Sequence, residues 1–255
     1  MIKKIFQSII PIKQRINLRY FSYKIRAIKY YGNRYTCNCC GKSFRKFLDY
    51  GNIKRQNAAC PFCDSLERNR VLWFYLKNEL KIETEKIKLL HFAPERILKK
   101  NIKKLKNIDY INGDIDPSMA DTVIDITNTK LPDNSFDLII CAHVLGHVLN
   151  EKKGVDEMFR ILQPNGIALI LTVVDKNNEE TFENSEIITE NDKLTFYGEK
   201  NLLRKHGLDF GKRLSISGFN VEEINYAEIL GKDIHEKFCL GNGERETIYK
   251  CTKQN

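Results

Sequence analysis

Two short apolar runs, Leu138–Cys141 and Ile167–Val174, flank a stretch of helical periodicity in the second half of the chain. Runs of this length that are rich in β-branched residues suit buried strands. Turn signals precede both runs, with Asp133-Asn134 before the first and Pro164-Asn165-Gly166 before the second. Apolar residues recur at helical spacing over 158–162. The pattern therefore predicts a strand–helix–strand unit, the building block of a doubly wound parallel sheet.

Other segments extend this sheet. Three strands are expected before the unit and a closing pair after it: Ile87–Phe92, Ile108–Asn112, Asp121–Ile126, Phe219–Ile229 and Arg245–Cys251. Only the seven residues Asp114–Ala120 join the second strand to the third. Parallel crossovers usually take about a dozen residues or more, so either the third strand is short or the connection lacks its helix. The fold class expected is α/β.

Polar side chains follow several of these strands, at the edge where such sheets bind ligands. Cys141 is the last residue of the run Leu138–Cys141, and His143 and His147 follow it. Asp114 follows the second strand and lies nineteen residues beyond Glu95. An acid about 20 residues after the first turn is the expected acceptor for ribose hydroxyls in a nucleotide-binding fold.

Several motifs resemble those of class I S-adenosylmethionine-dependent methyltransferases. They are Phe136-Asp137 opening a strand, His143–Val148 after it, and Leu162–Gly166 before the next strand. Over about residues 35–251, the chain resembles a bacterial subgroup with an N-terminal cysteine module and "LHxAPE" at the first turn. The last five letters of that motif correspond to His91–Glu95 here. Two departures are Gly146, where the subgroup usually has Glu, and Asn165, which replaces the first Gly.

The resemblance implies a Rossmann-like fold with a mostly parallel seven-stranded sheet, helices on both faces, and S-adenosyl-L-methionine as cofactor. It implies that the helix beginning near Pro94 directs its N-terminus at the cofactor carboxylate, although the turn has no glycine. Asp125 would contact the adenine amino group, and Ile126 would stack near the base. The cofactor-binding residues expected are His91, Ala93, Pro94, Glu95, Asp114, Ile115, Asp125, Ile126, Cys141 and His143. The alternative is a strand-to-helix turn without a ligand.

The same resemblance places His143 beside the cofactor, His147 near the methyl acceptor, and substrate-binding loops in the inserted segment 175–215. The catalytic residues expected are His147, His143 and Arg204, with His147 as general base and Arg204 orienting an anionic acceptor. A structural role is the alternative for each histidine. Asn201-Leu202 and His206 depart from the subgroup's pattern, which either retunes the substrate site or signals its loss.

The cysteines suggest a metal site. Cys37, Cys40, Cys60 and Cys63 have the spacing C-x2-C-x19-C-x2-C, which suits two knuckles that hold a structural zinc in a ribbon. Cys39 is the competing neighbour of Cys40. The alternative is a set of reduced thiols whose metal site has decayed. The module is expected over residues 35–66, and Asp64–Glu67 predicts a capping box at the start of a buried helix.

The net charge of +9 is an N-terminal property. Residues 1–48 hold twelve Lys and Arg and no acid, and the remainder holds 30 basic and 33 acidic residues. Within residues 1–34 a helical wheel places Arg15, Arg19, Arg26 and Lys29 on one face and Ile16, Tyr20, Phe21, Ile25, Ile28 and Tyr31 largely opposite. Such a helix binds an anionic membrane or RNA, or packs on its own domain with a solvated basic edge.

Together these features predict a methyltransferase domain over residues 67–255 behind the cysteine module. The acceptor expected is a small molecule, a glycan or a lipid-linked compound. The alternatives are an RNA methyltransferase and a non-catalytic scaffold with a decayed fold. No apolar run reaches the roughly 18 residues needed to cross a membrane, and the first residues lack the features of a secretory signal. We therefore expect a cytoplasmic protein, peripheral at the membrane if the basic helix binds lipid.

Overall fold

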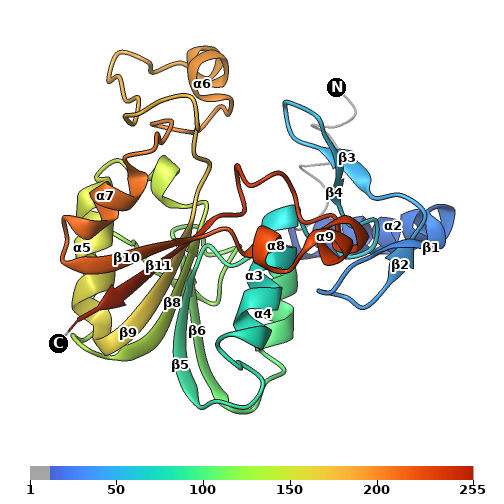
Figure 1. Ribbon diagram of the computed structural model, residues 1–255, viewed down its shortest axis with the longest axis horizontal. Helices are drawn as coiled ribbons and strands as arrows, with labels where there is room; N and C mark the ends of the chain where they lie inside the picture. Colours follow the sequence, from blue (N-terminus) through green and yellow to red (C-terminus); the bar gives the residue numbers. More distant parts are fainter. Residues whose placement is uncertain (1–11, 255) are drawn as a thin grey trace.

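The computed structural model describes residues 12–254 and is built around one seven-stranded sheet (Figure 1). The strands lie in the order β10-β11-β9-β8-β5-β6-β7. Their bounds are β5 Ile87–Phe92, β6 Ile108–Asp114, β7 Thr122–Val123, β8 Phe136–Ala142, β9 Leu162–Leu171, β10 Phe219–Ile224 and β11 Ile248–Lys253. All neighbouring pairs from β9 to β7 are parallel, and β11 is antiparallel to both β9 and β10. The predicted α/β class and mostly parallel sheet are confirmed.

The strand alternation feeds two apolar cores, one on each face of the sheet. In β5, Leu89 belongs to the core that includes α3 (Glu67–Asn78) and α4 (Arg96–Ile102), whereas Leu90 belongs to the core that includes α5 (Glu151–Ile161) and α7 (Phe210–Ser215). Side chains alternate between faces because the strand repeat is two residues. Figure 1 shows α3 and α4 on one side of the sheet and α5 and α7 on the other.

The third strand, β7, has only two residues, and no helix joins it to β6 within the described chain. Both explanations of the short connection therefore hold: the third strand is short, and the connection has no helix. Asn112 and Asp121 fasten the loop instead. The Asn112 amide donates to the Asp121 carboxylate at 2.8 Å, and the Asp121 backbone N–H donates to the Asn112 side-chain carbonyl at 3.0 Å. This pair holds β7 beside β6 without a packed crossover helix.

The N-terminal part consists of helix α2 (Ile12–Lys29) and two small antiparallel pairs. The first pair is β1 (Tyr31–Thr36) with β2 (Ser43–Phe44), and the second is β3 (Leu48–Tyr50) with β4 (Arg55–Ala59). Cysteines and aromatic residues of this part share one core with the sheet, because Cys37 and Phe47 belong to the same buried cluster as Leu89. The cysteine module therefore packs directly on the larger domain.

Helix α3 joins the two parts and begins at Glu67, later than the predicted cap implies and with a different N-cap residue. Leu66 is the N-cap residue, and the Asn69 side chain accepts from its backbone N–H at 2.8 Å. The predicted capping box over Asp64–Glu67 is wrong, because the Glu67 carboxylate instead pairs with Arg55 at 2.9 Å. Arg70 in the same helix is fully buried and donates to four backbone carbonyls, those of Ala58, Ser65, Phe238 and Cys239.

The chain after β9 builds the rest of the molecule. The remaining elements are the short helix η1 (Leu145–His147), α6 (Glu190–Tyr197), α8 (Tyr226–Ile229) and α9 (Lys232–Phe238). The insert with α6 stands off the sheet in Figure 1, whereas α8 and α9 extend toward the cysteine module. The predicted strand Phe219–Ile229 ends at Ile224 because residues 226–229 turn into α8. Among the described residues, no helix is long and apolar enough to span a bilayer.

Candidate functional site

Four cysteines converge in the N-terminal module. One ligand atom of each of Cys37, Cys40, Cys60 and Cys63 lies within 4.8 Å of the others, with Cys37 and Cys63 sulfurs 3.5 Å apart and Cys40 and Cys60 sulfurs 3.8 Å apart. Each pair sits in a tight turn, closed by a backbone bond from Gly41 to Cys37 and from Asp64 to Cys60. The donor set, four thiols from two such turns, is the one that structural zinc sites use.

Cys39 lies outside this group although it is next to Cys40. Its thiol donates to the backbone carbonyl of Asn69 at 3.6 Å and is buried. Burial raises the pKa of the Cys39 thiol well above its usual value, and hydrogen bonding to Cys37 adds to the rise. Cys39 therefore stays protonated and packs as a core residue, whereas a metal ligand must be a thiolate.

The module is bonded to the helix that follows the first strand of the sheet. The Arg96 guanidinium donates to the Cys63 carbonyl at 3.0 Å, and the Asn101 amide donates to the Cys39 carbonyl at 2.7 Å. Both donors belong to α4, while both acceptors are cysteines of the two knuckle segments. The position of α4 is thus tied to the backbone around the sulfur cluster.

The turn after β5 takes an unusual backbone path. Ala93 has φ +44°, in the left-handed region that disfavours side chains, so a small residue suits it. His91 is fully buried, with its ring nitrogens 3.1 Å from the Tyr110 hydroxyl and 3.2 Å from the Glu95 carboxylate. Pro94 is buried as well. His91 therefore supports the turn from the protein interior, whereas Ala93 and Glu95 are partly exposed.

Glu95 is the N-cap of α4 and connects the turn to α3. The Asn69 amide donates to its carboxylate at 2.8 Å. Burial acts to raise the pKa of Glu95, but hydrogen bonding from His91 and the charges of His91 and Arg68 outweigh it and hold that pKa below its usual value. The carboxylate is therefore ionised at neutral pH.

The acids expected to contact a nucleoside lie at the ends of the next two strands. One Asp114 carboxylate oxygen accepts the Asp116 backbone N–H at 2.8 Å, and the following residue, Ile115, is 74% exposed. One Asp125 oxygen accepts from the backbone and hydroxyl of Thr127, both at 2.8 Å. Ile126 is buried in the core beside Gly154, so it does not line an open surface.

The end of β8 supplies the histidines. Cys141 is fully buried between strands, so its thiol is closed to a ligand in this structure. His143 has φ +57°, and its Nε2 lies 3.1 Å from the Arg245 carbonyl. Burial lowers the pKa of His143 well below its usual value, and the nearby charges of Arg68 and Arg245 lower it further. His147 ends η1, with its Nδ1 3.0 Å from the Asn201 carbonyl.

A pocket of about 840 Å³ opens in front of these histidines, lined by several separate parts of the chain. They are the turns after β8 and β9, the insert around α6, the β3–β4 hairpin of the cysteine module, Arg68 of α3 and the loop before β11. Lining residues from these parts include His143, His147, Thr172, Leu202, His206 and Tyr50. The volume suits a small organic ligand. His147, His143 and Arg204, predicted from sequence as catalytic, are brought together in this pocket.

Arg204 lies in the pocket wall with all of its donors used. Its guanidinium donates to both oxygens of Glu183 at 2.8 and 2.9 Å and to the carbonyls of Leu145, Val148 and Leu149 at 2.6 to 3.1 Å. The predicted bidentate grip on an anionic acceptor is therefore wrong for this conformation, because no N–H remains for it. Arg204 instead fixes the turn that carries His147.

The sequence analysis did not predict a second set of hydrogen-bonded side chains in this region, which is buried. The Thr172 hydroxyl lies 3.0 Å from His206 Nδ1, His206 Nε2 lies 2.5 Å from the Glu151 carboxylate, and Arg213 donates to the same carboxylate at 2.8 Å. The pKa of Glu151 lies below its usual value, since bonds and charges from His206 and Arg213 outweigh the effect of burial. The signal in the sequence was His206 itself, noted only as a departure from the subgroup.

Arg68 was also missed. It lies on α3 between the turn after β5 and the pocket, 3.6 Å from the Glu95 carboxylate, and its side chain is 19% exposed. Its Nε is buried without a hydrogen-bond partner. A mostly buried guanidinium with such a donor is costly unless a further acceptor satisfies it. No local pattern pointed to this role, because in the sequence Arg68 is one polar residue of a capped helix.

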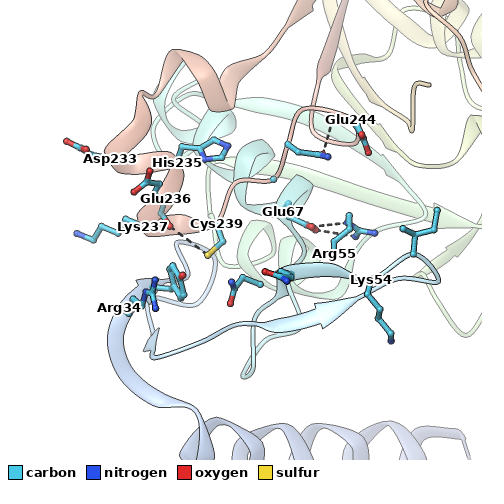
Figure 2. Close-up of a pocket in the computed structure, with 16 residues that line it drawn as sticks. Arg34, Lys54, Arg55, Glu67, Asp233, His235, Glu236, Lys237, Cys239 and Glu244 are labelled. Atoms are coloured by element: carbon cyan, nitrogen blue, oxygen red, sulfur yellow. Dashed lines mark hydrogen bonds and ion pairs between the residues drawn. The ribbon is translucent and has the colours of Figure 1, made fainter. Parts of the chain in front are cut away.

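A second hollow of about 950 Å³ lies between the cysteine module and α9 (Figure 2). Its wall mixes acids and bases, and Figure 2 shows Arg55 paired with Glu67 across it, at 2.9 Å. Asp233 and Lys237 of α9 are among the charged residues that line it. Because its charges are balanced and partly paired, we assign it no ligand.

Comparison with known proteins bears on the sheet. Residues 89–170, which run from β5 into β9, match the family profile described as a methyltransferase domain. No curated protein matches the chain.

Solved structures resemble the chain at low identity. The [4+2]-cyclase SpnF is 13% identical, with a TM-score of 0.50 over 82% of this chain and 86% of that one. The YcgJ protein from Bacillus subtilis is 14% identical, with a TM-score of 0.46 over 69% and 97%. A Burkholderia thailandensis 1,6-didemethyltoxoflavin-N1-methyltransferase, solved with S-adenosylhomocysteine, is 10% identical, with a TM-score of 0.47 over 74% and 78%. At such identities the likeness concerns the fold. Residues 89–170 thus resemble a methyltransferase domain, and they lie in a Rossmann-like, mostly parallel sheet.

Proposed function

We propose that the protein is an S-adenosylmethionine-dependent methyltransferase that acts on a small-molecule, glycan or lipid-linked acceptor. The observation that carries the proposal is the match of residues 89–170 to a methyltransferase domain, combined with the strand ends of that segment. Ala93, Asp114 and His143 end or follow the adjacent parallel strands β5, β6 and β8. Such strand ends are where nucleotide-type ligands bind in open α/β sheets.

Asp114 and Ile115 form the nucleoside side of the proposed site. One Asp114 oxygen is engaged by the Asp116 backbone, which fixes the carboxylate and leaves its second oxygen to accept ribose hydroxyl protons. The exposed Ile115 side chain next to it offers apolar surface for an adenine ring. Asp125, at the end of the neighbouring short strand, is the proposed acceptor for the adenine amino group.

Arg68 is the proposed partner of the methionine carboxylate. The guanidinium lies beside Glu95 and lines the same pocket as His143, and its buried Nε has no hydrogen-bond partner. A carboxylate placed there would satisfy this donor by a charge-assisted bond. Glu95 is the only acid paired with Arg68 among the described residues, at 3.6 Å, so an incoming anion does not have to displace a tight ion pair.

The cofactor supplies an electrophilic methyl group for direct in-line transfer to the acceptor atom. The residues of this chain then have to orient the acceptor and take its proton. His147 projects from the turn that Arg204 holds, at the mouth of the pocket, and is the proposed general base. His143, which is neutral because its pKa is lowered, is available as a hydrogen-bonding partner.

Zinc is the proposed occupant of the four-cysteine cluster. Four thiolates leave no open coordination position, so the ion would stabilise the module and take no part in the transfer. The cluster lies behind α3 and α4 and is bonded to α4 through Arg96 and Asn101. Its proposed role is therefore to hold the wall of the cofactor site.

Calorimetry with S-adenosylhomocysteine tests the cofactor part of the proposal. Asp114→Asn should weaken binding by roughly 1.5–3 kcal/mol, the range for hydrogen bonds to a charged group. Asp116→Asn is the matched control, because Asp116 is exposed and only caps its own turn. Wild-type protein that does not bind the ligand would favour a non-catalytic scaffold.

A second ligand isolates the role of Arg68. Arg68→Met should weaken S-adenosylhomocysteine, which carries the carboxylate, but leave 5′-methylthioadenosine, which lacks it, unchanged. Equal losses for both ligands would assign Arg68 to the support of the turn instead. The acceptor is to be found by transfer of labelled methyl groups in cell extracts. With that acceptor, His147→Ala should lower turnover by about 10²-fold without changing cofactor affinity.

A further inference from the structure

Helix α2 presents a narrow apolar stripe to solvent. Leu18, Phe21, Ile25 and Ile28 are 51%, 61%, 56% and 77% exposed. At 3.6 residues per turn these four positions fall within about 80° of the helix circumference. Four large apolar side chains in one line are not the scattered surface hydrophobics that need no explanation. We therefore expect the stripe to contact a partner.

The opposite side of α2 is fastened to the cysteine module, so the stripe cannot simply turn inward. The Arg26 guanidinium donates to the Pro61 carbonyl at 2.9 Å and to the Asp64 carboxylate at 3.2 Å, and the Tyr23 hydroxyl donates to Asp64 at 3.0 Å. The packed-helix alternative expected a solvated basic edge. Arg26 faces inward instead, but Lys24 and Lys29 are exposed as that alternative expected, and the solvated face between them carries the apolar stripe. The side chains of Arg15 and Arg19 lie outside the described residues.

Lysines border the stripe on both sides. Helical geometry places Lys29 just beyond Leu18 at one edge and Lys24 just beyond Ile28 at the other, and both are exposed. The first 48 residues carry twelve Lys and Arg and no acid. An apolar line bordered by lysines suits the boundary between acyl chains and anionic headgroups, where the lysine ammonium groups reach the phosphates.

We propose that the α2 stripe is a docking surface for an anionic lipid bilayer, on which the helix lies parallel to the membrane. A second copy of the chain is disfavoured, because pairing two stripes would bring together two segments that are basic and lack acids. RNA is disfavoured because leucine and isoleucine offer no contact to phosphates, and the inward guanidinium of Arg26 is already paired. This proposal does not depend on the methyltransferase function.

Vesicle sedimentation with the full chain tests it. Wild-type protein should bind vesicles made of equal parts phosphatidylcholine and phosphatidylserine, and bind pure phosphatidylcholine at least tenfold more weakly. Phe21→Glu combined with Ile25→Glu should abolish binding. The matched control is Ile188→Glu with Ile229→Glu, two exposed apolar residues elsewhere, at 74% and 68% exposure. Lys24→Gln should cost about fivefold, the contribution of one lysine near an anionic surface.

Any of the following results would overturn the proposal. One is equal binding to both vesicle types, or none to either. Another is a stripe variant that binds anionic vesicles like wild type. The third is ultracentrifugation showing a wild-type dimer that the stripe variant converts to a monomer, which would assign the stripe to self-association. Unchanged thermal unfolding and S-adenosylhomocysteine binding in the stripe variant would show that any loss comes from the surface and not from misfolding.

Discussion

The four-cysteine cluster and the pocket at the sheet edge are assembled in opposite ways. The cluster takes its four sulfurs from two short turns that lie within 27 residues of sequence. The pocket takes its lining from the β3–β4 hairpin, the turns after β8 and β9, the α6 insert and the loop before β11. One centre is thus built locally and the other by long-range packing.

This difference predicts how each region fails. A change in the cluster removes one of four equivalent ligands and should collapse the whole centre. A change in the pocket should be absorbed in part by its hydrogen-bonded supports, such as Arg204 and the His206–Glu151 pair. The two regions are also linked through α4, whose N-cap Glu95 pairs with the pocket residue Arg68, so that a defect in one can be measured in the other. The following predictions use these differences.

The largest effect is expected at the cluster. Cys60→Ser should reduce zinc from about one ion per chain to nearly none and lower the thermal midpoint by about 10 °C or more, since the metal contributes to folding. Atomic absorption and calorimetry measure both. Cys39→Ser is the control and should keep its metal, because Cys39 bonds to a backbone carbonyl outside the cluster. Zinc-free wild-type protein, purified without chelator, would contradict the assignment.

The next effect concerns the support of the pocket. Glu151→Gln removes the charge that His206 and Arg213 share in a buried position, and should lower the free energy of unfolding by about 3 kcal/mol. Because these bonds hold the insert to the sheet, residues 175–209 should also become cleavable by protease before the rest of the chain. Urea unfolding and limited proteolysis are the measurements.

The matched control for that variant is Glu228→Gln, since Glu228 is exposed on α8 and should change stability by no more than about 0.5 kcal/mol. If the insert of the Glu151→Gln protein were cut no faster than in wild type, the network would not be what joins the insert to the sheet.

A smaller effect should connect the two regions. Removing zinc with a chelator should weaken S-adenosylhomocysteine binding about tenfold, a typical coupling between distinct sites. The reason is that Arg96 and Asn101 bond α4, whose N-cap is Glu95, to the cysteine backbone. Asn101→Ala should reduce the dependence on zinc while the protein keeps its metal. Affinity that is identical with and without zinc would show two energetically independent regions.

The smallest effect is a pH dependence at His143. Its folded-state pKa is depressed by burial and by Arg68, so only the unfolded chain gains a proton as the pH falls below the usual imidazole value of about 6.5. Stability is therefore present above that pH and is lost as pH falls through it. His143→Asn suits the left-handed backbone there and should reduce the loss between pH 7.5 and 5.5 by about 1 kcal/mol. Identical pH profiles would contradict the depressed pKa.

Local patterns in the sequence determined much of the fold. The strand β5 was predicted as observed, over Ile87–Phe92, where Leu89, Leu90 and Phe92 supply apolar side chains to the two faces of the sheet. The class of the sheet followed from the strand–helix–strand pattern of residues 138–174. The four clustered cysteines followed from their spacing, since two tight turns fix sulfur positions almost without help from the rest of the chain.

Only the tertiary structure decided which of the expected site residues are open to a ligand and which support it. His91, Cys141 and Ile126 are buried. The guanidinium N–H groups of Arg204 are all bonded to Glu183 and to the turn after β8. Arg68 and the Thr172–His206–Glu151 chain became visible only through partners far away in sequence. A sequence specifies residue types and local periodicity. Burial and hydrogen-bond partners are set by contacts between distant segments, which no local pattern contains.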